Sequence, residues 1–86
     1  MNMARFSSEQ FRECVKKHLA DGRRRSAPFI ELTSGDVHRE VGGYPGTGHA
    51  MPSCCNAMRN LMGPRDQIVA EPPKGNGASL RIRYYL

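Results

Sequence analysis

The segment that most restricts the fold of this chain lies at its C-terminal end, where apolar and polar residues alternate strictly. Three apolar residues point to one side of an extended chain, and the residues between them point to the other: Leu80, Ile82 and Tyr84 against Ser79, Arg81, Arg83 and Tyr85. The strand-like segment 67–71 precedes them, and the intervening loop contains an Asn76-Gly77 turn dipeptide. The pattern predicts a two-stranded antiparallel hairpin.

A capping box indicates the first helix. Ser7 stands three residues before Gln10, so the hydroxyl and the amide can each accept a hydrogen bond from a free backbone N–H. An apolar stripe at helical spacing begins at Phe11. We expect this helix to run from Ser7 to Ala20 and to end at Asp21-Gly22, because glycine adopts the left-handed conformation that follows a helix.

A second, short helix is indicated after an extended apolar piece, residues 28–32. Thr33 is suited to the N-cap position, and Gly42-Gly43 provides the stop. We expect His38, Arg39 and Glu40 to lie on the outer side of this helix.

The third helix follows a turn-rich connector. Pro52 suits its first position, since the fixed φ of proline fits there and the missing N–H is not needed. Gly63-Pro64 ends the helix. Its apolar residues recur at helical spacing and define a buried side: Cys54, Cys55, Met58, Leu61 and Met62.

The chain has 86 residues, which is enough for one small domain with one core. Its apolar share of 38% is that of an ordinary globular protein. We expect residues 1–86 to form a single domain, with 1–6 as a loose tail. The apolar sides of the elements should meet in one core: Phe11, Val15, Leu19, Val37, Val41, Met58, Leu61, Leu80 and Ile82.

The order of these elements is that of the winged helix-turn-helix superfamily. The chain resembles this superfamily over roughly Ser7 to Leu86, which implies an α+β fold with three helices and a C-terminal two-stranded hairpin, the wing. In that superfamily the third helix typically enters the major groove, and the wing touches the backbone or the minor groove. The connector from Gly42 to Met51 is longer than the usual turn. Residues 31–46 also resemble a segment of small bacterial proteins, which implies no activity.

The charge balance favours a polyanionic partner. Thirteen Lys and Arg residues against eight Asp and Glu residues give a net charge of +5. Three groups of residues are candidates for contact with double-stranded DNA. Asn and Arg on the outer side of the third helix suit base edges, whereas the glycine-rich hairpin loop, its cations and an arginine run suit phosphates. The candidates are Ser53, Asn56, Arg59 and Asn60; Lys74, Asn76, Arg81 and Arg83; and Arg23, Arg24 and Arg25.

Each group also has an ordinary structural explanation. The helix residues would form a plain polar face, the hairpin charges would discourage edge-to-edge aggregation, and the arginine run would be a solvated loop.

We expect no metal, cofactor or catalytic centre. Cys54 and Cys55 are adjacent and point about 100° apart on a helix, a poor arrangement for zinc with His38 or His49. A Cys55–His49 pair lacks an identifiable orienting residue and oxyanion site. The three cysteines indicate no disulfide framework. Residues 43–49 have P-loop-like glycines without the Lys and Ser/Thr of that motif.

These observations lead to one functional expectation and one alternative. No apolar run approaches the roughly 18 residues of a membrane span, and the first residues lack a secretory signal, so we expect a cytosolic protein. We expect it to bind double-stranded DNA, as a regulator or as a module beside other proteins. The alternative is a protein–protein interaction module with the same fold and no nucleic acid.

Overall fold

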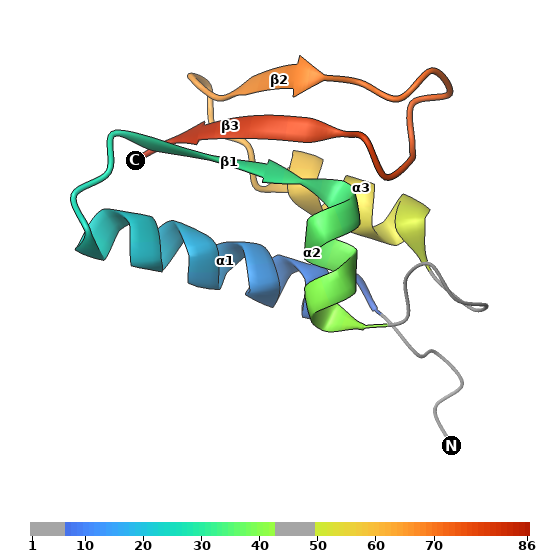
Figure 1. Ribbon diagram of the computed structural model, residues 1–86, viewed down its shortest axis with the longest axis horizontal. Coiled ribbons are helices and arrows are strands. Elements are labelled where there is room, and N and C mark those ends of the chain that lie inside the picture. The colour runs from blue at the N-terminus through green and yellow to red at the C-terminus, as the bar shows by residue number, and fades with distance from the viewer. Residues whose placement is uncertain (1–6, 43–49) are drawn as a thin grey trace.

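Three helices lie on one side of a three-stranded antiparallel sheet in the computed structural model, which describes residues 7–42 and 50–86 (Figure 1). The elements follow one another as α1 (Ser8–Arg24), β1 (Phe29–Thr33), α2 (Ser34–Val41), α3 (Met51–Asn60), β2 (Gln67–Ala70) and β3 (Arg81–Tyr85). The α+β class and the three helices agree with the sequence prediction. The expected loose tail, 1–6, lies outside the described residues.

The capping box of α1 is confirmed, but its predicted end is wrong. Ser7 Oγ accepts from the backbone N–H of Gln10, and the Gln10 side chain accepts from the backbone N–H of Ser7. The helix continues through Gly22 to Arg24. Gly22 serves close packing here, because a Cβ at this position would lie 2.6 Å from Leu86 Cδ1 and 2.9 Å from a methyl group of Ile30. The left-handed turn falls instead on Ser26, with φ of 60°.

The sheet contains one strand more than the predicted hairpin. The strand order is β1-β3-β2, so the C-terminal strand lies between the other two. Phe29 pairs with Tyr85 and Thr33 with Arg81 along β1 and β3. On the other side β2 pairs with β3, with an irregularity between Ile68 and Ala70. The extended piece predicted before the second helix is therefore a full strand of the same sheet.

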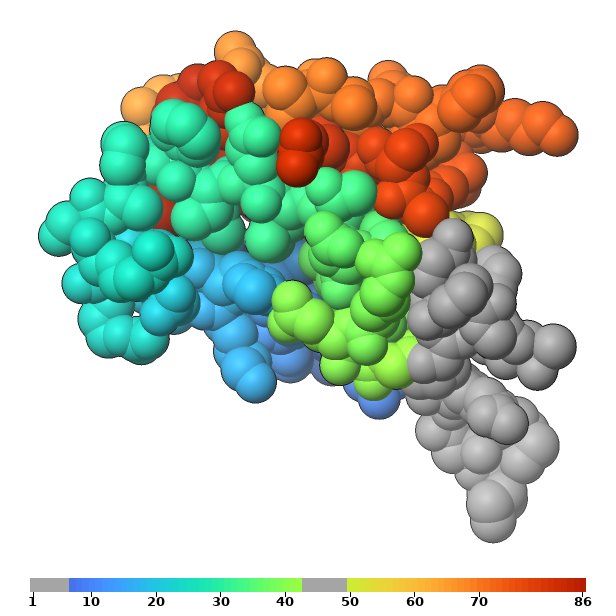
Figure 2. Space-filling view, in the orientation of Figure 1, coloured from blue at the N-terminus to red at the C-terminus, as the bar shows by residue number. Residues whose placement is uncertain are grey.

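The alternation predicted for β3 is confirmed by burial. Leu80, Ile82 and Tyr84 are buried against the helices, whereas Arg81 is exposed and Arg83 is partly exposed on the open face. The loop between β2 and β3 projects beyond the helices at one end of the molecule, as Figure 2 shows in orange.

The expectation that His38 faces outward is wrong. Its side chain is fully buried, with its ring 4.8 Å from that of Phe11, and its Nε2 accepts a hydrogen bond of 2.9 Å from the backbone N–H of Ala50. The reason is that α2 packs against both α1 and α3, so two sides of this short helix are covered. The sequence pattern of Val37 and Val41 accounted for one side alone.

One core joins the helices to the sheet, as predicted. Seven of the nine predicted core residues are buried, and Val41 and Leu61 are partly buried at its margin. The core also includes residues beyond the predicted set: Met51, Cys54, Cys55, Ala57 and Tyr84.

Two further observations concern the helices. Pro52 is the second residue of α3 and not the first, because the helix begins at Met51. None of the described helices has the length and apolar character that crossing a membrane requires.

Candidate nucleic-acid interface

Arg59 of α3 fastens the loop between β2 and β3 to the helix. One guanidinium nitrogen donates to Oδ1 of Asn76 at 2.8 Å, and another donates to the Gly75 carbonyl and lies 3.4 Å from the carboxylate of Glu71. The Arg59 side chain is 27% exposed. Arg59 and Asn76 were predicted as separate DNA contacts, and the structure brings them together as partners of each other.

A second set of contacts holds the same loop, from the start of α2 and from Cys55 of α3. The Gly77 carbonyl accepts from Ser34 Oγ at 2.5 Å and from Cys55 Sγ at 3.3 Å. The backbone N–H of Gly35 donates to the Ala78 carbonyl at 3.0 Å. A Cβ on Gly35 would lie 3.1 Å from that carbonyl oxygen, a contact tighter than most Cβ atoms make, so glycine suits this close approach. The loop is therefore attached at both sides to the helical layer.

We group the polar residues on the outer side of α3 with the loop that Arg59 holds, and we call this set the α3–loop surface. It consists of Ser53, Asn56 and Asn60 of the helix, Lys74 of the loop, and Arg59 between them. Asn56, Asn60 and Lys74 are exposed, and Ser53 is partly buried. This surface offers amide groups for hydrogen bonding and one exposed ammonium group.

Arg81 and Arg83 lie elsewhere, on the open face of the sheet. The period-two prediction that they share a side is confirmed, because both guanidinium groups reach Glu31 of β1, at 3.8 Å and 2.6 Å respectively. The Arg83 guanidinium also lies 4.7 Å from the centre of the Phe29 ring. Hydrogen bonds to Tyr85 and to Glu31 raise the pKa of Arg83 above its usual range. A phosphate would have to compete with these contacts for both arginines.

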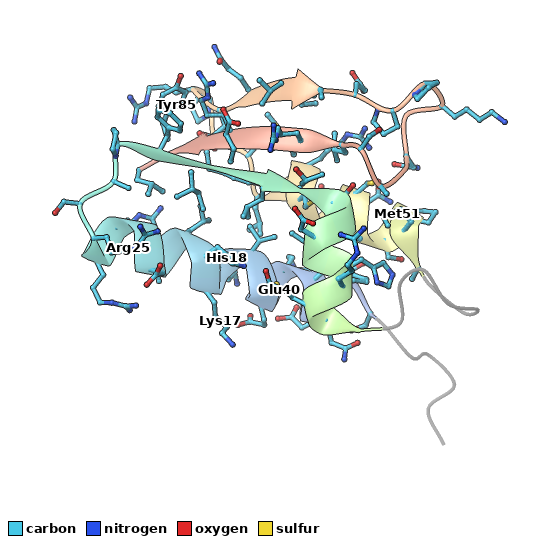
Figure 3. All side chains as sticks on the ribbon, viewed as in Figure 1. Lys17, His18, Arg25, Glu40, Met51 and Tyr85 are labelled. Carbon is cyan, nitrogen blue, oxygen red and sulfur yellow. The ribbon has the colours of Figure 1, made fainter. Side chains whose placement is uncertain are left out.

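The arginine run lies at the end of α1, far along the molecule from the α3–loop surface. Figure 3 shows Arg25 near one end of the long axis and Met51, the first residue of α3, near the other. Asp21 accepts from Arg24 at 2.7 Å and from Arg25 at 2.9 Å. The hydrogen bond from Arg25 lowers the pKa of Asp21. Arg23, Arg24 and Arg25 are thus not brought together with the other candidates.

The thiols of α3 belong to the core. Cys54 and Cys55 are both fully buried, and Cys54 Sγ donates to the Ser34 carbonyl at 3.5 Å. Burial raises the pKa of Cys54 to about 12, which opposes a role as a thiolate nucleophile. His49 and the P-loop-like stretch 43–49 lie outside the described residues.

Sequence reasoning overlooked one group of reactive side chains, where α2 packs against α1. Cys14 and His18 are four residues apart on α1, and both reach Glu40 of α2. The sequence signal that could have identified part of this group is the i, i+4 spacing of Cys14 and His18, which places both on one side of a helix. Glu40 could not be assigned to the group from the sequence, because its position there depends on the packing of α2 against α1.

Comparisons of this chain with protein-family models, with curated proteins and with solved structures find no match. Its functional interpretation therefore depends on the geometry of its own residues.

Proposed function

We propose that this protein is a winged-helix domain that binds double-stranded DNA through the α3–loop surface. The element order and the strand order β1-β3-β2 support this proposal, because they attach a C-terminal hairpin beside the third helix. The observation that carries it is the set of Arg59 contacts, which holds the hairpin loop against α3. A loop fixed in this way is in position to follow a DNA backbone while α3 enters a groove.

The proposed contacts divide into two kinds. Asn56 and Asn60 are exposed four residues apart on α3, where amide groups can pair with adenine edges. Lys74 and the backbone of the glycine-containing loop face the phosphates. In this proposal Arg59 and Asn76 position the loop. Arg81 and Arg83, engaged with Glu31, contribute less than the sequence suggested.

The experiment is a fluorescence anisotropy titration with a labelled random-sequence duplex across roughly 50–200 mM salt. Lys74→Gln should weaken binding to all sequences and reduce the slope of log K against log salt by about 1. Asn56→Ala should alter the preference among sequences and leave that slope unchanged.

Lys17→Gln is the matched control. It removes the same charge from an exposed lysine on α1, and Figure 3 shows Lys17 pointing away from the sheet. If Lys17→Gln changes the salt slope as much as Lys74→Gln does, the protein binds DNA as a diffuse cation and not through the α3–loop surface. Absence of salt-dependent binding by the wild type would refute the DNA proposal.

One observation favours the protein-interaction alternative. Strand β2 is an edge strand of the described sheet, and its Ile68 and Val69 are 39% and 45% exposed. An exposed apolar edge can accept a strand from another polypeptide. The irregularity beside Val69 and the shortness of β2 limit such pairing. If another polypeptide pairs with β2, Val69→Lys should abolish concentration-dependent self-association or the binding of that polypeptide. The same substitution should leave DNA binding intact.

A further inference from the structure

We propose that Cys14, His18 and Glu40 form a binding site for one zinc ion between α1 and α2. The proposal concerns a site separate from the α3–loop surface and does not depend on DNA binding. Figure 3 shows His18 of α1 and Glu40 of α2 side by side below the sheet.

The donor atoms already lie close to the spacing that zinc requires. His18 Nε2 is 2.8 and 2.9 Å from the two carboxylate oxygens of Glu40, and Cys14 Sγ is 3.6 Å from one of them. One donor atom from each of the three residues lies within 4.8 Å of the others. Bond lengths of about 2.0–2.3 Å in a tetrahedral site place ligand atoms roughly 3.3–3.8 Å apart. The distances from His18 Nε2 to Glu40 are shorter than this and the 4.8 Å limit is longer, so the three side chains would have to rotate to admit the ion.

The chemistry of the donor set selects zinc among common divalent ions. Thiolate, imidazole and carboxylate are the three ligand types that zinc takes in proteins, whereas magnesium and calcium prefer oxygen alone. The three residues leave a fourth position for water. On binding, the Cys14 thiol would lose its proton to solvent, and His18 would give up the Nε2 proton that it donates to Glu40 and keep or take a proton on Nδ1. The His18–Glu40 hydrogen bond would then be replaced by two bonds to the metal, and the thiolate and carboxylate would balance the charge of the ion.

The hollow that contains the cluster is lined by four carboxylates and two cationic side chains: Glu9, Glu13, Asp21 and Glu40, with Lys17 and Arg24. Glu9, Glu13 and Asp21 already form ion pairs with Arg12, Lys16 and Arg24, so Glu40 is the carboxylate of this hollow that the proposal assigns to the metal. The site is open to solvent and spans two helices that already pack together. A metal ion can therefore enter it without unfolding the domain.

The alternative is that the three side chains form only an interhelical hydrogen-bonded cluster. Titration of chelator-treated full-length protein with Co²⁺ separates the two, because cobalt replaces zinc in such sites and a thiolate ligand gives a charge-transfer absorption band. We expect one Co²⁺ per chain, a thiolate band, and displacement by one equivalent of Zn²⁺.

Variants locate the site. Mutation of a residue that only hydrogen-bonds to a metal ligand commonly weakens metal binding by about 10–100-fold. Cys14→Ser and His18→Gln each remove a ligand itself, so each should weaken Zn²⁺ binding by at least about 100-fold. Cys14→Ser should also lose the thiolate band. Glu13→Gln is the matched control: it removes a neighbouring carboxylate of the same hollow, which is paired with Lys16, and should bind as the wild type does.

Circular dichroism identifies the variants that keep their fold. If Cys14→Ser does not fold, His18→Gln provides the test. The proposal is overturned if the wild type binds neither ion at stoichiometric level. It is equally overturned if a folded Cys14→Ser or His18→Gln variant binds as tightly as the wild type.

Discussion

Replacing Arg59 by Met tests how the β2–β3 loop is held. The substitution keeps most of the aliphatic stem and removes the guanidinium that donates to Asn76 and to the Gly75 carbonyl. Hydrogen bonds from a charged donor contribute about 1.5–3 kcal/mol each when buried, and an exposed ion pair such as that with Glu71 contributes about 0–1 kcal/mol. Arg59 is partly exposed, and its acceptors can turn to water once it is removed, so we expect a total loss of about 1–3 kcal/mol.

Urea denaturation followed by circular dichroism measures this loss, and Arg12→Met is the matched control. The Arg12 side chain is 32% exposed, close to the 27% of Arg59, but its ion pair is with Glu9 on the same helix. We expect Arg12→Met to cost no more than about 0.5 kcal/mol. Equal stability losses in the two variants would refute the inference that Arg59 fastens the loop. A folded Arg59→Met variant should also bind duplex DNA more weakly than Arg12→Met does.

Three further predictions concern the core and its margin. Tyr84→Phe removes the hydrogen bond of 2.8 Å to the Met58 carbonyl. Because this carbonyl also accepts a hydrogen bond from the backbone N–H of Leu61, the free energy of unfolding should fall by only about 1 kcal/mol. A loss above about 3 kcal/mol in urea denaturation would contradict this expectation. Burial raises the pKa of Cys54 from 9.0 to about 12 and also raises the pKa of Tyr84. The folded protein therefore keeps the full contribution of these two neutral side chains to its free energy of unfolding below about pH 9, and loses that contribution as the pH rises through the folded-state pKa values. Denaturation midpoints should therefore decline between pH 9 and 12, and less steeply in Tyr84→Phe above pH 10; a flat profile would count against both shifts. Gly22→Ala should destabilise by about 1–3 kcal/mol despite the better helix propensity of alanine, because the new Cβ would lie 2.9 Å from a methyl group of the β-branched Ile30 as well as against Leu86. An increase in melting temperature would disprove that clash.

Local signals in the sequence predicted most of the elements. The Ser7–Gln10 capping box fixed the start of α1, and the alternation of Leu80, Ile82 and Tyr84 fixed which side of β3 is buried. Both signals concern hydrogen bonds or side-chain directions within a few residues. The end of α1 was mispredicted because Gly22 is also a signal for close packing, and the residues it packs against are distant in the chain.

The candidate sites depended on contacts that no local pattern contains. Arg59 reaches the loop 16 and 17 residues later, and Arg83 reaches Glu31 across 52 residues. Charge and spacing identified Arg59 as a candidate for contact with base edges and Arg83 as a candidate for contact with phosphate. The pairing of β1 with β3 and the packing of the loop on α3 determined that both already have partners.

The sequence by itself determined where helices and strands form and which of their sides are apolar, because those properties follow from backbone hydrogen bonding and from the 3.6- and 2-residue periods. Only the tertiary structure decided that α2 is covered on two sides, that His38 is buried, and that Glu40 meets Cys14 and His18. The physical reason is that such juxtapositions arise from the packing angles of whole elements around a shared core. Those angles depend on all the buried side chains together.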